Sequence, residues 1–391
     1  MTRHLYVHVP FCGRRCTYCD FSIAVRRAVP LEAFLAALAR EIALTGAHPG
    51  ETLYLGGGTP SRLGGEGIAA LARLLALQRE LAEFTLEANP EDVTTESVRA
   101  WVRAGVNRVS LGAQSFDDRV LAWMHRTHDA AGVAAAVRAV RAGGIANLSL
   151  DLIFALPAPL GRDWRRDLDA AIALEPDHVS LYGLTIEPGT PLFRQVGRAE
   201  TAPATEERYE EEYLFAHERL RAAGYAFYEV SNAARPGREA VHNRAYWQLE
   251  PYLGIGPAAH SFDGVSRWWN EGAYAKWRER LAQGRSAVAG HEILNDHQRS
   301  LEQMYLALRT SAGLDLPDPC PPKLREALDR WAAAGWALIE GARGLGGTGA
   351  PEAAPGEPDS SAPSRASVRP CAHARLTPRG WLRLDELVAS I

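Results

Sequence analysis

Three of the five cysteines lie within eight residues near the start of the chain, with the spacing C-x3-C-x2-C at Cys12, Cys16 and Cys19. Thiolates are soft ligands that suit zinc, copper(I) and iron–sulfur clusters. A [4Fe–4S] cluster takes four ligands, so three cysteines would leave one iron without a protein ligand. The spacing therefore predicts a cluster whose fourth iron is open to chemistry.

Two other roles for these cysteines are less favoured. Structural zinc takes four ligands, usually from two pairs of the C-x2-C type, and this chain has one such pair, although His8 would supply a fourth ligand. A disulfide framework is not expected in a long chain without an export signal.

Composition bounds the class of protein. At 391 residues the chain suggests two domains, and 47% hydrophobic residues are ample for a buried core. A net charge of −4 gives no reason to expect nucleic acid as a partner. The start of the sequence has no signal-peptide pattern, and no apolar run reaches the roughly 18 residues of a membrane span. We therefore expect a soluble, cytoplasmic protein.

The first 200 residues alternate strand-like and helix-like runs, which predicts an α/β fold with a parallel sheet. The strands are expected at 5–9, 52–55, 84–88, 108–111, 147–153 and 178–184. The helices that the apolar periodicity predicts most clearly are at 31–44, 66–77, 95–104, 130–142 and 206–222, with a further strand at 225–230.

The unusual residues follow the ends of these strands. They are the cysteine loop, the run GGGTP at 56–60, Glu87, Gln114, Asp151 and Thr185. In barrels of parallel strands, sites gather at the carboxyl ends of the strands. Glycines after the second strand would let the backbone approach a ligand closely, because they lack Cβ atoms. We expect one face of the sheet to carry the site.

Three regions are expected. Residues 1–235 would form the barrel with the cysteine loop, and 236–289 form an aromatic-rich segment that could line a site for a large flat ligand. Residues 290–391 would form a small, mainly helical, winged-helix-like domain, with helices at 296–309 and 322–334. Within it, the low-complexity stretch 341–372 is expected to be an insertion, and Thr377 is expected to cap a last helix that starts at Pro378.

Five motifs together resemble one known family. They are YVHVPFC at 6–12, GGTP at 57–60, EANP at 87–90, SLGAQS at 110–115 and DLIFALP at 151–157. The whole chain is similar to the oxygen-independent coproporphyrinogen III oxidase-like family of radical S-adenosylmethionine (radical SAM) proteins. The resemblance implies a partial (β/α)6 barrel of the TIM type. It also implies a [4Fe–4S] cluster on Cys12, Cys16 and Cys19, with SAM on the open iron.

The same resemblance implies the residues that contact SAM. Carried over position by position, they are Tyr6, Tyr18, Gly57, Gly58, Thr59, Glu87, Gln114, Arg126, Asp151 and Thr185.

The family contains both oxidases and HemW-type heme chaperones, and three features resemble the chaperones. The oxidases have a fourth cysteine in the cluster loop, where this chain has Phe21. They also have an N-terminal extension, whereas four residues precede the first predicted strand here. The chaperones share H-N-x-x-Y-W, found here as HNRAYW at 242–247.

The chaperone resemblance implies heme as cargo, bound near His242, Asn243, Tyr246 and Trp247, and passed to respiratory acceptor proteins. Neutral imidazole is a common axial ligand of heme iron, and Arg235, Arg238 and Arg244 are nearby partners for propionates. It also implies transient membrane association through acceptors and a homodimer. The alternatives are a coproporphyrinogen III oxidase, which would decarboxylate propionates oxidatively, and another radical SAM enzyme.

Overall fold

The computed structural model describes residues 3–77, 80–317, 319–341 and 372–391. Its contacts divide the chain into two compact units, residues 1–300 and 301–391. The predicted insertion at 341–372 lies outside the described residues except for its two end positions. Each unit is treated by itself below.

The six predicted strands all form in the first unit, as neighbours in one parallel sheet. They are β1 (His4–Val9), β4 (Thr52–Gly57), β5 (Glu83–Ala88), β6 (Arg108–Gln114), β7 (Asn147–Phe154) and β8 (His178–Gly183). In β1 the aliphatic residues Leu5, Val7 and Val9 are fully buried. The alternate residues His4, Tyr6 and His8 point to the other face, because successive side chains in a strand alternate. That inner face is polar and aromatic.

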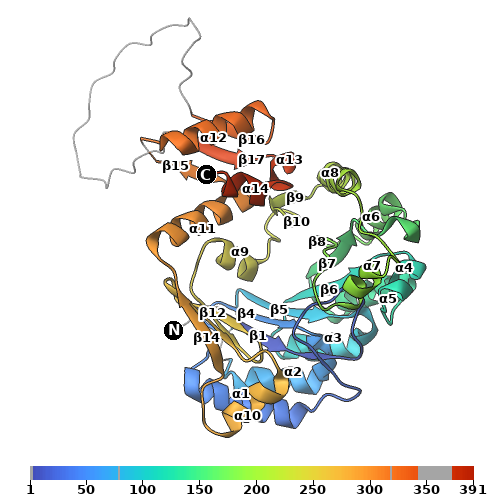
Figure 1. Cartoon of the computed structure of the whole chain (residues 1–391). Helices are drawn as coiled ribbons and strands as arrows, with labels where there is room; N and C mark the ends of the chain where they lie inside the picture. Colours follow the sequence, from blue (N-terminus) through green and yellow to red (C-terminus); the bar gives the residue numbers. More distant parts are fainter. Residues whose placement is uncertain (1–2, 78–79, 318, 342–371) are drawn as a thin grey trace, which may run out of the picture. The chain divides into compact units, whose positions relative to one another are not determined.

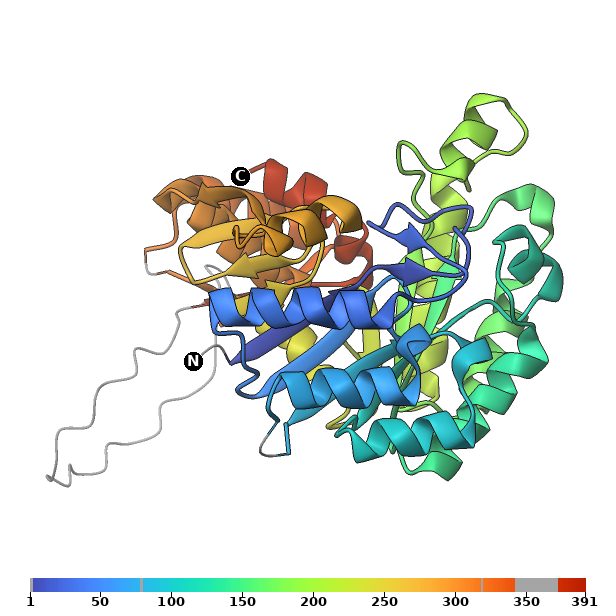
Figure 2. The same cartoon turned by 90° about the horizontal axis from the view of Figure 1, so that it is seen from below.

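Helices cover the outer face, and Figures 1 and 2 show α1, α2 and α3 along it. The helices between the parallel strands are α1 (Leu31–Thr45), α2 (Gly64–Leu74), α3 (Thr95–Arg103), α4 (Asp118–Trp123), α5 (Ala130–Gly143) and α6 (Trp164–Ala173). Helix α3 begins with a capping box between Thr94 and Ser97, and α1 ends at Gly46 in a left-handed conformation. The predicted ranges of α1, α3 and α5 are confirmed within about a residue, the accuracy expected of helix ends.

The parallel sheet continues on both sides into strands from later in the chain. After β8 come α7 (Pro191–Gly197), α8 (Glu206–Ala222), β9 (Ala226–Glu229) and β10 (Asn232–Ala234). After these come α9 (Val241–Trp247), β11 (Tyr252–Ile255), β12 (His260–Phe262), β13 (Ser266–Asn270), α10 (Tyr274–Ala282) and β14 (Val288–Ile293). The sheet order is β14-β13-β12-β11-β1-β4-β5-β6-β7-β8-β10-β9. Strand β11 pairs parallel with β1, so the aromatic-rich segment extends the barrel sheet.

The second unit combines a small sheet with helices. It contains most of α11 (Asp296–Arg309), then β15 (Leu314–Leu316), α12 (Pro322–Ala333), β16 (Ala337–Glu340), β17 (Ala372–Leu376), α13 (Pro378–Trp381) and α14 (Leu384–Ala389). The strands pair antiparallel in the order β15-β17-β16. The Thr377 side chain accepts a hydrogen bond from Gly380 N at the start of α13, as its predicted capping role requires. Trp331 and Trp381 are buried in this unit.

Candidate functional site

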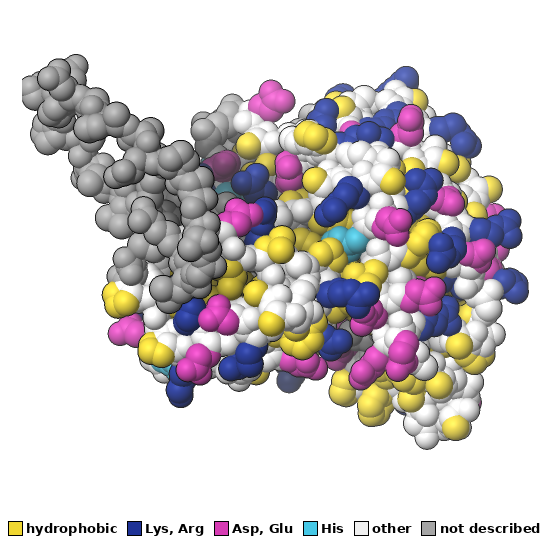
Figure 3. All heavy atoms as spheres, turned by 90° about the horizontal axis from the view of Figure 1, so that it is seen from above, with side chains coloured by type: hydrophobic (Ala, Val, Ile, Leu, Met, Phe, Trp, Pro, Cys, Tyr) yellow, Lys and Arg dark blue, Asp and Glu magenta, His cyan; other side chains and the backbone are white. Residues whose placement is uncertain are grey.

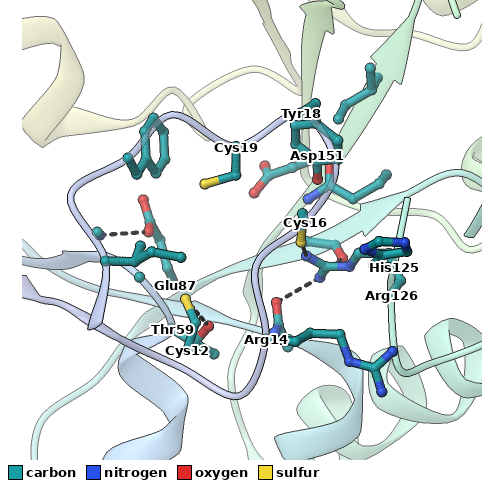
Figure 4. A pocket seen from close by; sticks show the side chains of 18 of the residues that line it. Cys12, Arg14, Cys16, Tyr18, Cys19, Thr59, Glu87, His125, Arg126 and Asp151 are labelled. Atoms are coloured by element: carbon teal, nitrogen blue, oxygen red, sulfur yellow. Dashed lines mark hydrogen bonds between the residues drawn. The ribbon is translucent and has the colours of Figure 1, made fainter. Parts of the chain in front are cut away.

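A cavity of about 600 Å³ opens at the carboxyl ends of the parallel strands in the first unit. Cys12, Cys16 and Cys19 all line it, and Figure 4 shows them around the same space as Glu87, Asp151 and Arg126. The cavity therefore gathers residues from the loops after five different strands into one site.

The cysteine loop is held at both ends and in the middle by backbone pairing. Cys12 ends β2 (Phe11–Cys12), which pairs parallel with β3 (Ala24–Val25). In the middle, Thr17 N donates to Met124 O at 3.4 Å, and Leu192 N donates to Thr17 O at 2.8 Å. The three thiols thus project from a loop whose backbone is held in place by hydrogen bonds.

The glycines after β4 allow two backbones to touch beside Cys12. Gly57 has φ of 111°, a region that favours glycine. A Cβ on Gly58 would lie 2.7 Å from the carbonyl carbon of Pro10, and Gly58 N donates to Val9 O at 2.8 Å. Thr59 then places Oγ1 3.4 Å from Cys12 Sγ. A Cβ on Gly57 would lie 2.6 Å from His8 Cε1, so no side chain fits at either glycine.

Two carboxyl groups, Glu87 and Asp151, line the same cavity as the thiols. Glu87 accepts hydrogen bonds from Tyr54 Oη at 2.8 Å and Gly57 N at 3.1 Å, yet burial raises its pKa to about 7. Asp151 accepts from Ser110 Oγ at 3.0 Å, and burial likewise raises its pKa. Both groups can accept hydrogen bonds from the hydroxyl or amino groups of a ligand.

One buried cation stands next to the cysteines. Arg126 places Nη1 3.6 Å from Cys16 Sγ, while Nη2 donates to Asn89 Oδ1 at 2.6 Å and to Gly112 O at 3.0 Å. Its Nε is buried, and no hydrogen-bond partner for it is found among the described residues. The guanidinium is therefore aimed by protein acceptors and brings a positive charge to the wall of the cavity.

A buried charge network behind the cavity holds two of its loops. Asp167 of α6 accepts from Ser115 Oγ at 2.6 Å and Phe116 N at 2.9 Å, directly after Gln114, whose φ is 67°. Arg162 links Asp167 to Glu212 of α8. This network was not predicted from the sequence. Its signal is an acidic residue, Asp167, on the apolar face of a helix.

The thiols fit a cluster better than a single metal ion. Among the described residues, no group of three His, Cys, Asp or Glu side chains is close enough to hold one ion. Both ring nitrogens of His8, the proposed fourth zinc ligand, are engaged: Nε2 donates to Ser22 O at 2.9 Å, and Nδ1 lies 3.2 Å from Tyr6 Oη. Burial raises the pKa of Cys12, and that of Cys19 to about 11. Buried thiols of this kind become thiolates when a cationic metal group binds.

Nine of the ten residues expected to contact SAM line this cavity. They are Tyr18, Gly57, Gly58, Thr59, Glu87, Gln114, Arg126, Asp151 and Thr185. Tyr6 is not among the described residues that line it. Its ring stacks on Tyr54, with ring centroids 6.0 Å apart, and Tyr54 in turn supports Glu87. Tyr6 thus supports the cavity lining through Tyr54 and does not itself line the cavity.

The four residues expected to contact heme lie on α9, away from the cavity lining. Two backbone N–H groups at the start of α9 donate to Glu83, the first residue of β5. His242 is fully buried, with Nδ1 2.7 Å from Thr52 Oγ1 and Nε2 2.8 Å from Tyr246 Oη. Thr52 begins β4, so α9 lies at the amino ends of the strands, the opposite end from the cysteines.

The tautomer of His242 follows from its neighbours. Thr52 Oγ1 also contacts His4 Nδ1 at 2.9 Å, and His4 Nε2 lies 3.1 Å from the Glu250 carboxylate. If His4 donates to Glu250, Thr52 donates to His4 and accepts from His242 Nδ1, and Tyr246 then donates to His242 Nε2. Burial lowers the pKa of His242 to about 3, which keeps the ring neutral. In this arrangement both of its nitrogens are satisfied within the protein.

Comparisons with known proteins identify the family. Residues 6–171 match the model of the radical SAM superfamily. The heme chaperone HemW of Mycobacterium tuberculosis is 41% identical over 80% of this chain and 83% of its own length. The chain belongs to the HemW family. The HemW of Bacillus subtilis is 36% identical over 79% of this chain and 84% of its own.

A solved structure supports the fold of this HemW-family chain. Coproporphyrinogen III oxidase (HemN) of Escherichia coli, described as a radical SAM enzyme, aligns with a TM-score of 0.77 over 99% of this chain and 89% of its own. At 20% identity this likeness shows the fold alone. The fold predicted from the motifs, a partial barrel with a smaller C-terminal region, is confirmed. None of the helices described here is both long and apolar enough to cross a bilayer.

Proposed function

We propose that this protein is a heme chaperone, which binds heme and transfers it to acceptor proteins. The observation that carries the proposal is relatedness to HemW heme chaperones along four fifths of the chain. Phe21 at the position of the oxidases' fourth cysteine agrees with it.

The cavity supplies the groups that the radical SAM cofactors need. Cys12, Cys16 and Cys19 would hold a [4Fe–4S] cluster, and SAM would complete its coordination and supply, when reduced, a source of radical chemistry. Arg126 would pair with an anionic group of SAM, and Glu87 and Asp151 would accept hydrogen bonds from it. In a chaperone we assign these groups a structural and regulatory role.

The HNRAYW motif on α9 would have a structural role at the amino ends of the strands. His242 and Tyr246 bind each other and the first residues of the strands, so they would fasten α9 across the amino end of the barrel.

The acceptors we propose are respiratory heme proteins, which the chaperone would reach by transient association with the membrane. The working form is a homodimer. Figure 3 shows basic and acidic side chains interspersed on one face of the molecule, a surface suited to short-lived contacts rather than to one strongly charged partner.

The proposal is tested by anaerobic titration of the cluster-loaded protein with hemin, followed in the Soret band. We expect saturable binding of one heme per chain. The heme should then be transferred to the apo-form of a heme b protein, which an affinity tag separates from the chaperone. A non-transferring heme protein, such as myoglobin, serves as the control donor. If hemin does not saturate, and the protein decarboxylates coproporphyrinogen III in the presence of SAM and a reductant, the chaperone proposal falls and the oxidase replaces it.

A further inference from the structure

The surface around the cysteine loop is basic, although the chain as a whole is acidic. Residues 12–28 contain four arginines and one acidic residue, Asp20, whereas the net charge of the whole chain is −4. Three of these arginines, Arg14, Arg26 and Arg27, are exposed. Positive charge is therefore concentrated on one small part of the first unit.

A fourth arginine, Arg62, holds the exposed ones close to the cysteine loop. Its Nη2 donates to Arg26 O at 3.1 Å and to Arg27 O at 3.2 Å. Its Nη1 would lie 2.9 Å from a Cβ on Gly13, the residue before Arg14. Guanidinium groups stay protonated at physiological pH, so the positive charges of all four arginines gather around Gly13.

The exposed arginines of this surface have no acidic partner in the described part of the chain. No carboxylate is found there within ion-pair distance of any of the three, although Asp92 lies close enough to Arg62 for their charges to interact. Exposed arginines elsewhere in the first unit do form ion pairs, as Arg3 does with Glu250 at 2.6 Å. The basic surface is thus left free to bind an anionic partner.

Two apolar side chains protrude beside these arginines. Val25 is 44% exposed and pairs with Cys12 in the short ribbon of β2 and β3. Phe21 is 58% exposed and lines the cavity, as Arg14 does. Large apolar side chains are more stable out of water, so a partner that covers them gains free energy. The residues that we call the arginine patch are Arg14, Phe21, Val25, Arg26 and Arg27.

Resting on the chaperone function proposed above, we propose that the arginine patch binds the surface of an anionic lipid bilayer. The three arginines would pair with lipid phosphates. Phe21 and Val25 would enter the boundary between headgroups and acyl chains. The patch would then hold the chaperone at the membrane, where the proposed acceptors lie.

A bilayer fits the patch better than an acidic protein does. Its anionic headgroups are dense and mobile, so they can reach arginines at any spacing, and its apolar layer lies directly beneath them. An acidic protein would have to place carboxylates opposite each arginine and a pocket opposite each of Phe21 and Val25. The two apolar side chains protrude singly, which suits insertion into an interface.

The test is sedimentation of the full-length, cluster-loaded protein with lipid vesicles in the absence of heme. One set of vesicles contains phosphatidylcholine and phosphatidylglycerol in equal parts, and the other contains phosphatidylcholine alone. The double variant Arg26→Gln with Arg27→Gln removes two charges and leaves the backbone contacts of both residues in place. Its matched control, Arg165→Gln with Arg166→Gln, removes two exposed neighbouring arginines from α6.

A second pair of variants tests the apolar part of the patch. Val25→Ser is compared with Val265→Ser, because Val265 is 45% exposed and lies outside the patch, between β12 and β13. Iron and sulfide content are measured in every variant to confirm that the cluster is retained.

We expect the wild type to sediment with the anionic vesicles and not with the neutral ones, and added salt to weaken the binding. The double variant Arg26→Gln with Arg27→Gln should bind about tenfold or more weakly, because both lost charges face the headgroups. Val25→Ser should bind about threefold more weakly, since it loses apolar surface that the bilayer covers. Both control variants should match the wild type.

Several results would overturn the inference. They include equal binding to both kinds of vesicle, no binding to either, and the same loss in the α6 control as in Arg26→Gln with Arg27→Gln. Capture by poly-glutamate in place of vesicles would assign the patch to an acidic protein. Displacement from the vesicles by an equal concentration of inorganic phosphate would reduce it to a site for free phosphate. None of these outcomes depends on heme, so the hemin titration decides the chaperone function separately.

Discussion

At the level of single residues, burial decides the chemistry of the cysteine loop. Cys12, Cys16 and Cys19 are all partly buried in one cavity, and burial disfavours the thiolate form of Cys12 and Cys19. The thiols are therefore poor nucleophiles until a metal group replaces their protons. Cys320, which lies in the other unit, is outside this environment.

Replacing any one of Cys12, Cys16 and Cys19 with serine should abolish cluster binding, because a cluster with an open iron already has one protein ligand fewer than usual. Iron and sulfide analysis, with the visible absorption of the reconstituted protein, measures this. Cys320→Ser is the control and should load normally. A full cluster in all three loop variants would contradict the assignment of the loop.

At the level of elements, buried carboxylates join segments that are far apart in sequence. Asp167 on α6 holds the backbone just after Gln114, and the left-handed conformation of Gln114 persists only where surrounding contacts impose it. Glu41 on α1 likewise holds segments from later in the chain. It accepts hydrogen bonds from Gly256 N at 2.8 Å, Asn270 Nδ2 at 2.5 Å and Trp277 Nε1 at 3.1 Å.

Asp167→Ala should weaken SAM binding, because the loop that carries Gln114 loses its two hydrogen bonds to α6. It should also lower the free energy of unfolding by roughly 3 kcal/mol, since Arg162 loses a buried partner. Calorimetric SAM titration and urea unfolding measure the two effects. Asp169→Ala on the same helix removes an exposed ion pair with Arg219 and should change neither by more than about 0.5 kcal/mol. Unchanged SAM affinity in Asp167→Ala would rule out a positioning role.

Glu41→Ala should lower the free energy of unfolding by about 3 kcal/mol, because three buried donors, directly after β11, on β13 and on α10, lose their acceptor. Chemical denaturation followed by circular dichroism measures the loss. Glu32→Ala, an exposed position on the same helix, should have an effect within about 0.5 kcal/mol of zero. Similar losses in both variants would mean that Glu41 does not fasten these elements.

At the level of the whole molecule, buried titratable side chains make stability depend on pH in two opposing ways. Burial lowers the pKa of His242 to about 3, so below about pH 6.5 the unfolded chain binds a proton that the folded chain does not. This histidine therefore destabilises the fold as pH falls from about 6.5 towards 3. Glu41 and Glu87, whose pKa values are raised to about 7, act oppositely and destabilise the fold as pH rises from about 4.5 to 7.

The histidine contribution can be isolated by difference. Between pH 7 and 5, the wild type should lose about 2 kcal/mol more stability than His242→Gln, in which glutamine does not titrate. Urea unfolding of both proteins at several pH values measures the difference. Parallel pH profiles would show that His242 is solvated or charged in the folded protein.

The sequence by itself determined what depends on near neighbours in the chain. The spacing of Cys12, Cys16 and Cys19 predicted a cluster loop, and alternating apolar patterns predicted all six parallel strands. Thr377 was predicted as a helix cap from its own position alone, and the structure confirms it. In each case the physical cause acts over a few residues, through ligand spacing, side-chain alternation or a local hydrogen bond.

Only the tertiary structure decided the rest, because contacts between distant residues depend on how strands pair and helices pack. The pairing of β11 with β1 made the aromatic-rich segment part of the barrel sheet. The same packing buried His242 against Thr52, 190 positions earlier in the chain. His242, which its motif marked as a heme ligand, thus has both ring nitrogens hydrogen-bonded within the fold, which the sequence alone did not reveal.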